Sequence, residues 1–355
     1  MNRFRDYYFK LIFEKSGLHP FNIILLCLSY IYLIILKLKY LLYKTKILTQ
    51  KKLNVPVISI GNITLGGTGK TPMVVKIAKI FETTKKIGII TRGYKRKTDE
   101  PLIVTKKNLD VDKMGDEPCF ISKKLSNVCI GISRDKYKIA EKMIHDCNTD
   151  LLILDDGFQS ACITRDIDIV LVDVLNPFGN GFVLPRGILR QPKRSLKRAD
   201  IIILTKTNFA LKENVERLKI DLETKFNKQV FESEYVPMSL NLLGGDNKSS
   251  LDEIKNKDIS ILTGISNPDN FAKTLEGLEA KVVEKFAYPD HYWYKQDDIL
   301  DIVNKCKTDI IIITEKDTPK LMPFIDSFKG KKVYELIMDV KLQDELIKQA
   351  IIKAI

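Results

Sequence analysis

The pattern of hydrophobic positions divides the chain into one long apolar run near the start and many short apolar segments after it. From Pro20 to Leu36 no residue is charged, and lysines and arginines lie on both sides of this run. A helix of roughly 17 apolar residues is near the minimum length that spans a bilayer. Flanking cations and tyrosines are typical of segments at a membrane surface. We therefore expect residues 1–54 to form a membrane-associating helical segment.

Three interpretations of this apolar helix are open. It lies in the membrane interface, it spans the bilayer, or it is a buried core helix of a soluble domain. The interfacial helix is favoured because cations flank the run on both sides and tyrosines lie in and after it. A cleaved signal peptide fits poorly, since the apolar run starts late and no small-residue cleavage site follows it.

From Val55 onward, short apolar runs alternate with helical patterns. The expected strands are Val55–Ile60, Ile87–Thr91, Pro101–Thr105, Leu151–Leu154, Ile167–Val172 and Asp200–Thr205. The expected helices are Pro72–Thr84, Glu117–Leu125 and Arg134–Asp146. Continuously apolar strands that alternate with helices indicate a parallel sheet covered on both faces. Residues 55–206 therefore predict an α/β core domain.

A second, smaller α/β domain is expected over residues 207–355. Its expected strands are Asp258–Gly264, Lys281–Phe286 and Asp309–Thr314. Its expected helices are Leu211–Phe226, Asn270–Gly277, Lys295–Cys306 and Leu342–Ala354. The polar stretch Leu243–Ser250 reads as a loop. Ligands of parallel sheets gather at the carboxyl ends of the strands, so we look for chemistry there.

A glycine-rich loop between the first strand and the first helix is the strongest chemical signal. Strand, glycine loop, Gly-Lys-Thr and helix follow one another in the order of a phosphate-binding P-loop. Glycines let backbone N–H groups approach phosphate oxygens, and the helix N-terminus favours negative charge. Thr64 stands where the strict pattern has glycine. The predicted nucleotide-binding residues are Thr64, Leu65, Gly66, Gly67, Thr68, Gly69, Lys70 and Thr71.

Two acids follow another apolar strand. Asp155 and Asp156 come directly after Leu151–Leu154, as expected for the second magnesium element of a P-loop enzyme. Together with the hydroxyl of Thr71 they are the predicted Mg²⁺ ligands, and which of the two acids contacts the metal stays open. The stretch Thr205-Lys206-Thr207-Asn208 lacks the acid that reads guanine, so we expect ATP as the nucleotide.

The composition excludes few classes of protein, but the net charge limits which binding partners we expect. The 355 residues carry a formal net charge of +13, which fits nucleic acid, an anionic membrane or a phosphorylated substrate. No nucleic-acid-binding signature is present, so we expect no nucleic-acid partner. The six cysteines have no paired ligand spacing, which argues against a zinc site.

Several short strings in a fixed order resemble the tetraacyldisaccharide 4′-kinase family of lipid A biosynthesis. They run from the N-terminal apolar helix to Lys320, over most of the chain. The matching strings are V-P-V-I-S-I-G-N-I-T-L-G-G-T-G-K-T-P, T-R-G-Y-K-R, G-D-E-P, L-D-D-G-F-Q, V-L-P-R-G-I-L-R, Y-P-D-H-Y and T-E-K-D. The family shares the non-glycine residue at the position of Thr64.

The resemblance implies a membrane-associated kinase that uses ATP and Mg²⁺. The acceptor would be the 4′-hydroxyl of a tetraacyldisaccharide 1-phosphate, and the product lipid IVA, at the cytoplasmic face of the inner membrane of a Gram-negative bacterium. Lys70 matches the P-loop lysine, Asp116 the family's catalytic acid and His291 the histidine that partners it. Arg92 and Arg190 match basic positions suited to phosphate contacts. Taken alone, Asp116 reads as a helix cap and His291 as an ordinary histidine.

Three residues depart from the family pattern: Ser160, Ile188 and Gln191. They surround the inferred site, so they bear on substrate detail more than on nucleotide binding. Two other functions stay open on the residues alone. One is a membrane-tethered P-loop ATPase or switch that acts on a protein partner. The other is a non-catalytic, nucleotide-binding membrane scaffold.

Overall fold

The computed structural model describes residues 20–94, 96–105, 111–245, 248–265 and 267–355, and the chain divides into two compact units. The first is built from the described part of Met1–Ile90 with Asp135–Glu234 and Leu342–Ile355. The second contains Thr91–Arg134 and Tyr235–Lys341. The sequence predicts consecutive domains, whereas these units interleave along the chain. Hydropathy alone carries no sign of such an interleaving, because each excursion has the same α/β pattern.

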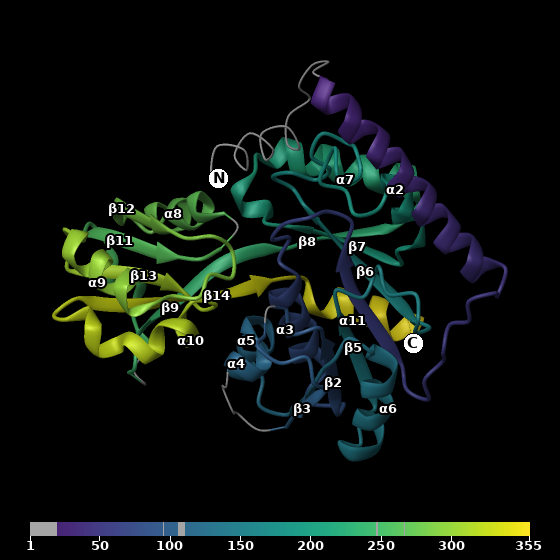
Figure 1. The fold of residues 1–355 in the computed structure, drawn as a ribbon, viewed down its shortest axis with the longest axis horizontal. Helices are drawn as coiled ribbons and strands as arrows, with labels where there is room; N and C mark the ends of the chain where they lie inside the picture. The colour runs from purple at the N-terminus through teal and green to yellow at the C-terminus, as the bar shows by residue number, and fades with distance from the viewer. Residues whose placement is uncertain (1–19, 95, 106–110, 246–247, 266) are drawn as a thin grey trace. The chain divides into compact units, whose positions relative to one another are not determined.

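The first unit is organised around a parallel sheet with the strand order β2-β5-β1-β6-β7-β8 (Figure 1). The neighbouring strands of this order pair in the parallel sense. In the central strand, Ile58 is in register with Ile153 on one side and Ile167 on the other. The strands are almost wholly buried, as a sheet covered on both faces requires. Their bounds are β1 Val57–Asn62, β2 Ile87–Thr91, β5 Leu151–Asp155, β6 Ile167–Asp173, β7 Ile201–Thr205 and β8 Gln229–Glu232.

Helices of the first unit precede, connect and follow these strands along the chain. They are α2 Pro20–Lys44, α3 Lys70–Phe81, α6 Lys136–Asp146, α7 Lys212–Phe226 and α11 Asp344–Ala354, with short 3₁₀ turns at Lys193–Arg198 and Thr207–Phe209. Helix α3 leaves the P-loop and packs on β1 and β5. Asp135 caps α6 by accepting from two backbone N–H groups of its first turn. The expected α/β architecture of this region is confirmed.

The second unit contains a six-stranded sheet with the order β10-β9-β14-β13-β11-β12. The neighbours of β11 and β13 are parallel, and β10 pairs with β9 in the antiparallel sense. The bounds are β9 Glu234–Leu242, β10 Lys248–Ser249, β11 Asp258–Thr263, β12 Lys281–Ala287, β13 Ile310–Thr314 and β14 Lys332–Lys341. An antiparallel pair joins β3 Leu102–Val104 to β4 Val128–Ile132, and β4 is the neighbour of β2 in the strand order.

Short helices complete the second unit. They are α4 Val111–Met114, α5 Asp116–Lys124, α8 Pro268–Glu276, α9 Gln296–Lys305 and α10 Thr318–Leu321, with 3₁₀ turns at Leu251–Ile254 and Met322–Phe328. The sequence predictions miss the strands β4, β9 and β14, and in the first unit they also miss β8. The predicted loop Leu243–Ser250 contains the two-residue strand β10. Strand β9 includes Pro237, and a proline inside a run obscures a strand pattern.

Helix α2 is confirmed as a long apolar helix, and most of its surface is exposed. It is the one helix of the described residues that is long and apolar enough to cross a membrane. Leu25 and Ser29 are buried against the first unit, one turn apart on one face. Isoleucines on the other faces, such as Ile31 and Ile34, are more than half exposed. The exposure of α2 therefore argues against the interpretation as a buried core helix. Residues 1–19 of the expected segment lie outside the described residues.

Candidate functional site

The P-loop joins β1 to α3 and has the backbone that its glycines allow. Gly66 and Gly69 have φ values of 106° and 84°, a region that side chains other than glycine rarely adopt. Gly69 caps α3, and Lys70 and Thr71 open that helix. Thr64 is buried and forms a short antiparallel bridge with Leu189 instead of turning. A non-glycine residue is therefore compatible with this position.

Hydrogen bonds from neighbouring side chains fix the backbone carbonyls of the P-loop. The Thr205 hydroxyl donates to the carbonyl oxygen of Thr68 at 3.1 Å, and the Lys206 ammonium donates to that of Gly67 at 2.7 Å. Asn62 donates to the Thr68 hydroxyl at 2.8 Å. Lys206 has the left-handed φ of 63°, and its ammonium also pairs with Asp173. The sequence identified this stretch only as a test of base specificity and missed its role in supporting the loop.

Asp155 and Asp156 lie at the carboxyl end of β5, beside β1. Asp155 pairs in register with Ile60, so the two acids follow the same sheet edge as the P-loop. Asp155 is buried, and the Lys136 ammonium donates to its backbone carbonyl at 2.7 Å. Two carboxylates and the buried Thr71 hydroxyl are hard oxygen donors, which is the donor set that Mg²⁺ prefers. The predicted metal residues therefore fit the ion chemically.

The two acids are not equivalent. Arg190 donates to both carboxylate oxygens of Asp156, at 2.8 and 2.9 Å, and the Lys70 ammonium lies 3.9 Å from one of them. Burial alone would raise the pKa of Asp156, but the hydrogen bonds from Arg190 and the charge of Lys70 outweigh it and lower the pKa. Both oxygens of Asp156 are therefore engaged by a guanidinium within the protein.

Arg190 belongs to a loop that lies against the P-loop. Its backbone N–H donates to the Ile63 carbonyl at 2.7 Å, and Leu65 donates to the Ile188 carbonyl at 2.7 Å. Ile188, one of the departures from the family pattern, is buried and would contact any side chain at Gly179. Gln191, another departure, accepts a hydrogen bond from Arg198. The loop therefore supports the nucleotide site through backbone contacts that tolerate these side chains.

Asp116 and His291 meet in the second unit. Asp116 is the first residue of α5, and His291 lies in the loop after β12; the His291 Nδ1 is 3.0 Å from the Asp116 Oδ2. An ionised carboxylate only accepts, so Nδ1 carries the hydrogen. His291 has a φ of 59°, an unfavourable conformation for a histidine that its backbone bond to Gly264 maintains. The two residues that the family resemblance pairs are thus in contact.

Charged neighbours control the ionisation of Asp116. Its side chain is 3% exposed, and the Lys320 ammonium lies 3.1 Å from Oδ2. Burial alone would raise the pKa of Asp116, but the hydrogen bond from His291 and the charge of Lys320 outweigh it and lower the pKa. Asp116 is therefore a carboxylate at neutral pH, which is the form that can accept a proton.

The arginines of the T-R-G-Y-K-R string differ in environment. Arg92 is exposed, and the structure gives it no ion pair within the described residues. The Arg96 guanidinium is better enclosed: its two terminal nitrogens are buried without a hydrogen-bond partner among the described residues. Burial lowers the pKa of Arg96, and neighbouring Asp99 partly offsets this. The sequence singled out Arg92 and not Arg96, because only the fold distinguishes the two.

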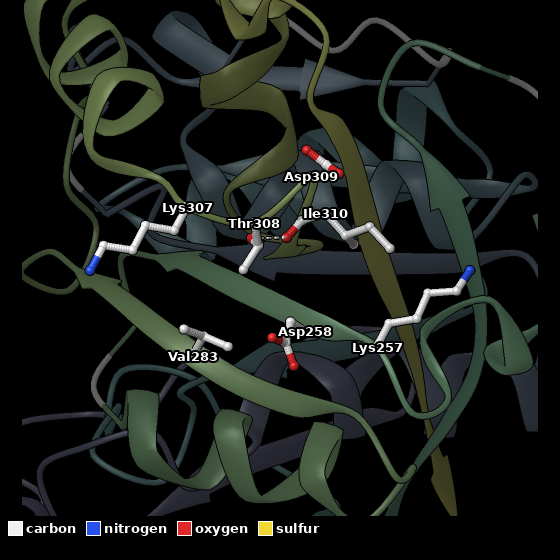
Figure 2. Close-up of a pocket in the computed structure, with 7 residues that line it drawn as sticks. All are labelled: Lys257, Asp258, Val283, Lys307, Thr308, Asp309 and Ile310. Carbon is white, nitrogen blue, oxygen red and sulfur yellow. Dashed lines mark hydrogen bonds between the residues drawn. The ribbon is translucent and has the colours of Figure 1, made fainter.

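The cavity in Figure 2 is not the site of this chemistry. It has a volume of about 360 Å³ and is lined by Lys257, Asp258, Val283, Lys307, Thr308, Asp309 and Ile310. These residues lie mainly at the amino-terminal ends of β11 and β13. The groups around Asp116 instead follow the carboxyl ends of the strands of this sheet, where ligands of parallel sheets bind.

Comparison with known proteins identifies the family. The family model described as tetraacyldisaccharide-1-P 4′-kinase matches residues 21–355. The tetraacyldisaccharide 4′-kinase of Halothermothrix orenii is 35% identical over 343 residues, covering 90% of this chain and 89% of the relative. That of Syntrophus aciditrophicus is 35% identical over 319 residues, covering 86% and 85%.

A solved structure agrees with this assignment. The crystal structure of an LpxK from Aquifex aeolicus in complex with ATP has a TM-score of 0.74 and 30% identity, and the match covers 94% of this chain and 99% of that one. The agreement extends over both α/β regions and not the P-loop alone. The chain belongs to the tetraacyldisaccharide 4′-kinase family.

Proposed function

We propose that this protein transfers the γ-phosphoryl group of ATP to the 4′-hydroxyl of a tetraacyldisaccharide 1-phosphate. Family membership supports the reaction, and the contact between Asp116 and His291 is the observation that carries it. A P-loop alone is equally consistent with an ATPase, which needs no base for a sugar hydroxyl. The buried, ionised carboxylate is the feature that a kinase with an alcohol acceptor requires.

The chemistry assigns a task to each group. The 4′-oxygen attacks the γ-phosphorus while the bond from that phosphorus to the β,γ-bridging oxygen breaks, and ADP leaves. The hydroxyl proton passes to Asp116, which His291 orients through Nδ1. Lys70 stabilises the negative charge on the transferred group. The donor residues belong to the first unit and Asp116 to the second.

Thr71 and Asp155 would hold Mg²⁺, with Asp156 beside them. When bound, the ion would neutralise charge on the β- and γ-phosphate oxygens. Arg190 keeps Asp156 ionised and oriented. Arg92 stays a candidate for a phosphate contact with the lipid.

The membrane role follows from helix α2. Ser29 donates to the Val183 carbonyl at 2.8 Å, and Tyr32 donates to the Arg190 carbonyl at 3.0 Å. One face of α2 is thus bonded to the loop that lies against the P-loop, while the isoleucines of its other faces are exposed. A helix with one face on protein and others apolar suits a membrane interface. We propose that the protein binds the cytoplasmic face of the inner membrane, where an acylated substrate is met.

The experiment uses the full chain, radiolabelled ATP and vesicles of phosphatidylethanolamine and phosphatidylglycerol that contain tetraacyldisaccharide 1-phosphate. We expect label to appear in the lipid and to depend on the acceptor. Phosphate release that is equal with and without acceptor would favour an ATPase and contradict the kinase. Nucleotide binding without any turnover would favour a scaffold.

The same vesicles, without acceptor, test the membrane proposal by sedimentation. A variant with Ile31→Asn, Ile34→Asn and Ile35→Asn should bind vesicles about tenfold more weakly or worse, because each buried isoleucine contributes ~1.5–3 kcal/mol. The matched control changes three exposed apolar residues outside α2: Leu211→Asn, Ile220→Asn and Ile352→Asn. Equal sedimentation of both triple variants and the wild type would refute the role of α2.

A further inference from the structure

Lys320 contacts the same carboxylate oxygen as His291. Its ammonium is 3.1 Å from the Asp116 Oδ2, and the His291 Nδ1 is 3.0 Å from that atom. Both side-chain hydrogen bonds that the structure records for Asp116 therefore end on Oδ2, and neither uses Oδ1. A carboxylate fixed through one oxygen presents the other in a defined direction.

The Lys320 ammonium also lies close to a second buried carboxylate, that of Asp317. Its side chain is 1% exposed, and its ammonium lies 3.4 Å from Oδ1 of Asp317, which is 0% exposed. Four neutral donors surround Asp317: the hydroxyls of Thr263, Thr314 and Tyr294 and the backbone N–H of Gly264. These donors stabilise Asp317 as an anion without adding charge, so the position of Asp317 is fixed and Lys320 is anchored between two carboxylates.

Gly264 leaves little room for a side chain beside this anchor. A Cβ at Gly264 would lie 3.2 Å from the Asp317 carboxylate and 3.3 Å from the Tyr294 hydroxyl. The backbone N–H of Gly264 donates to Asp317, and its carbonyl accepts from the backbone of His291. Gly264, the residue directly after β11, therefore contacts both Asp317, which anchors Lys320, and the loop that carries His291.

We propose that Lys320, anchored by Asp317, is a positioning residue that directs Oδ1 of Asp116 toward the acceptor hydroxyl and keeps the carboxylate ionised. This inference rests on the proposed kinase function and deepens it. Lys320 is not a catalytic residue in this view, since it acts through Asp116. A buried ammonium that only stabilised the fold would have no reason to share an oxygen with His291.

Charged and titratable groups lie near Asp116 on the neighbouring elements, and two of them, His291 and Lys320, contact it. They are Glu117 on α5, Asp290 and His291 after β12, Asp317 and Lys320 at α10, and Tyr294, whose hydroxyl contacts Asp317. Burial chiefly, and Asp317 next, raise the pKa of Tyr294 well above its usual range, so its hydroxyl stays a donor. Lys320 is the one permanent cation of this set, so its removal should change the acidity of Asp116 most.

The test compares Lys320→Met, Lys320→Arg and the wild type in the lipid transfer assay as a function of pH. In Lys320→Met the acid limb of kcat/KM should move upward by about 1 to 3 pH units, the usual effect of one adjacent charge on a carboxylate. Lys320→Arg retains the charge and should restore the limb toward that of the wild type. An acid limb in Lys320→Met that coincides with the wild type would overturn the proposal.

Lys124→Met is the matched control. Lys124 forms a largely buried pair with Glu315 in the same unit, with side chains 16% and 5% exposed, and none of its recorded contacts is with Asp116 or His291. It should lose stability without a change in the acid limb. If Lys320→Met does not fold, Tyr294→Phe removes one donor from Asp317 and should move the limb upward by a smaller amount. No movement in that variant would also overturn the proposal.

A readout without turnover separates this inference from the proposed function. The chain has three histidines, so the ring signals of ¹³C-labelled histidine can be assigned with His291→Gln. The His291 signal should move in Lys320→Met and stay in place in Lys124→Met. Failure of the wild type to phosphorylate lipid would reject the kinase function and leave this signal to decide the network. An unmoved His291 signal would reject the network, whatever the activity.

Discussion

Two aspartates, one in each compact unit, are held by basic side chains in different ways. In the first unit, Arg190 bonds both oxygens of Asp156. In the second unit, His291 and Lys320 both contact a single oxygen of Asp116. Burial raises the pKa of both carboxylates, but hydrogen bonds from Arg190 and His291, with the charges of Lys70 and Lys320, outweigh it and lower the pKa. The difference lies in what remains available: Asp156 has both oxygens engaged, while the recorded contacts of Asp116 leave Oδ1 to a substrate.

This difference teaches that ionisation alone does not identify a base. Either aspartate is charged at neutral pH, so a pKa criterion would select both. The direction of the hydrogen bonds separates them, because a base needs an oxygen that can accept the substrate proton. Asp156 is suited to electrostatic organisation of the nucleotide site, and Asp116 to proton transfer.

The largest effect should come from Asp116→Asn. Because the amide cannot take the proton, kcat should fall by about 10²–10⁴-fold, the usual cost of a lost general base. ATP affinity, which depends on the first unit, should change little. Transfer of label from ATP to lipid and equilibrium ATP binding measure the two effects.

The control for this variant is Asp112→Asn. Asp112 is a half-exposed carboxylate of α4 in the same unit, and it pairs only with Lys97 among the described residues. It should retain the activity of the wild type. If Asp116→Asn were as active as Asp112→Asn, the contrast between the two buried aspartates would have no catalytic meaning.

A smaller effect is expected for His291→Gln. The hydrogen bond from Nδ1 to a charged carboxylate is worth ~1.5–3 kcal/mol, so kcat should fall by about 10–100-fold. The folded pKa of Asp116 is lowered, which means that its activity is present above that pKa and lost as pH falls through it. Loss of His291 raises that pKa, so the acid limb of kcat/KM should move to higher pH. A fall in kcat with an unmoved limb would show that His291 acts other than through Asp116.

The sequence predicted the first unit better than the second, for physical reasons. The P-loop, α3 and the acids after β5 are encoded by strings whose members are close in sequence, and the parallel pairing of β1 and β5 brings them to one edge. Asp116 and His291 are 175 residues apart. Their contact depends on tertiary structure that no local period reveals, and only the resemblance to a known family linked them.

Other features could not have been found locally. Lys320 follows the T-E-K-D string, which matched the family without a role for the lysine. Its function depends on the burial of Asp317 and on the convergence of two donors on one oxygen. Likewise, the hydrogen bond of Lys206 to the P-loop carbonyl of Gly67 crosses 139 positions of sequence. Both residues are lysines, which are common in this chain, and their roles depend only on where the fold places them. The sequence therefore does not distinguish them from other lysines.

The smallest effect is expected for Arg190→Met, which tests the other half of the comparison. Loss of the guanidinium leaves Asp156 with only Lys70 nearby among its recorded ion pairs, 3.9 Å from its oxygen. The freed carboxylate would repel the ATP phosphates, so the dissociation constant for ATP should rise by about tenfold, or ~1.4 kcal/mol. The acid limb assigned to Asp116 should not move, because the groups that lower the pKa of Asp116 are His291 and Lys320 and not Arg190.

Arg165→Met is the matched control for this variant, since Arg165 pairs with Asp168 in the same unit, near the amino-terminal end of β6. It should bind ATP as the wild type does, because neither residue of that pair follows the sheet edge that carries the P-loop. An Arg190→Met protein with wild-type ATP affinity would mean that the paired oxygens of Asp156 are dispensable. The contrast between the two aspartates would then rest on Asp116 alone.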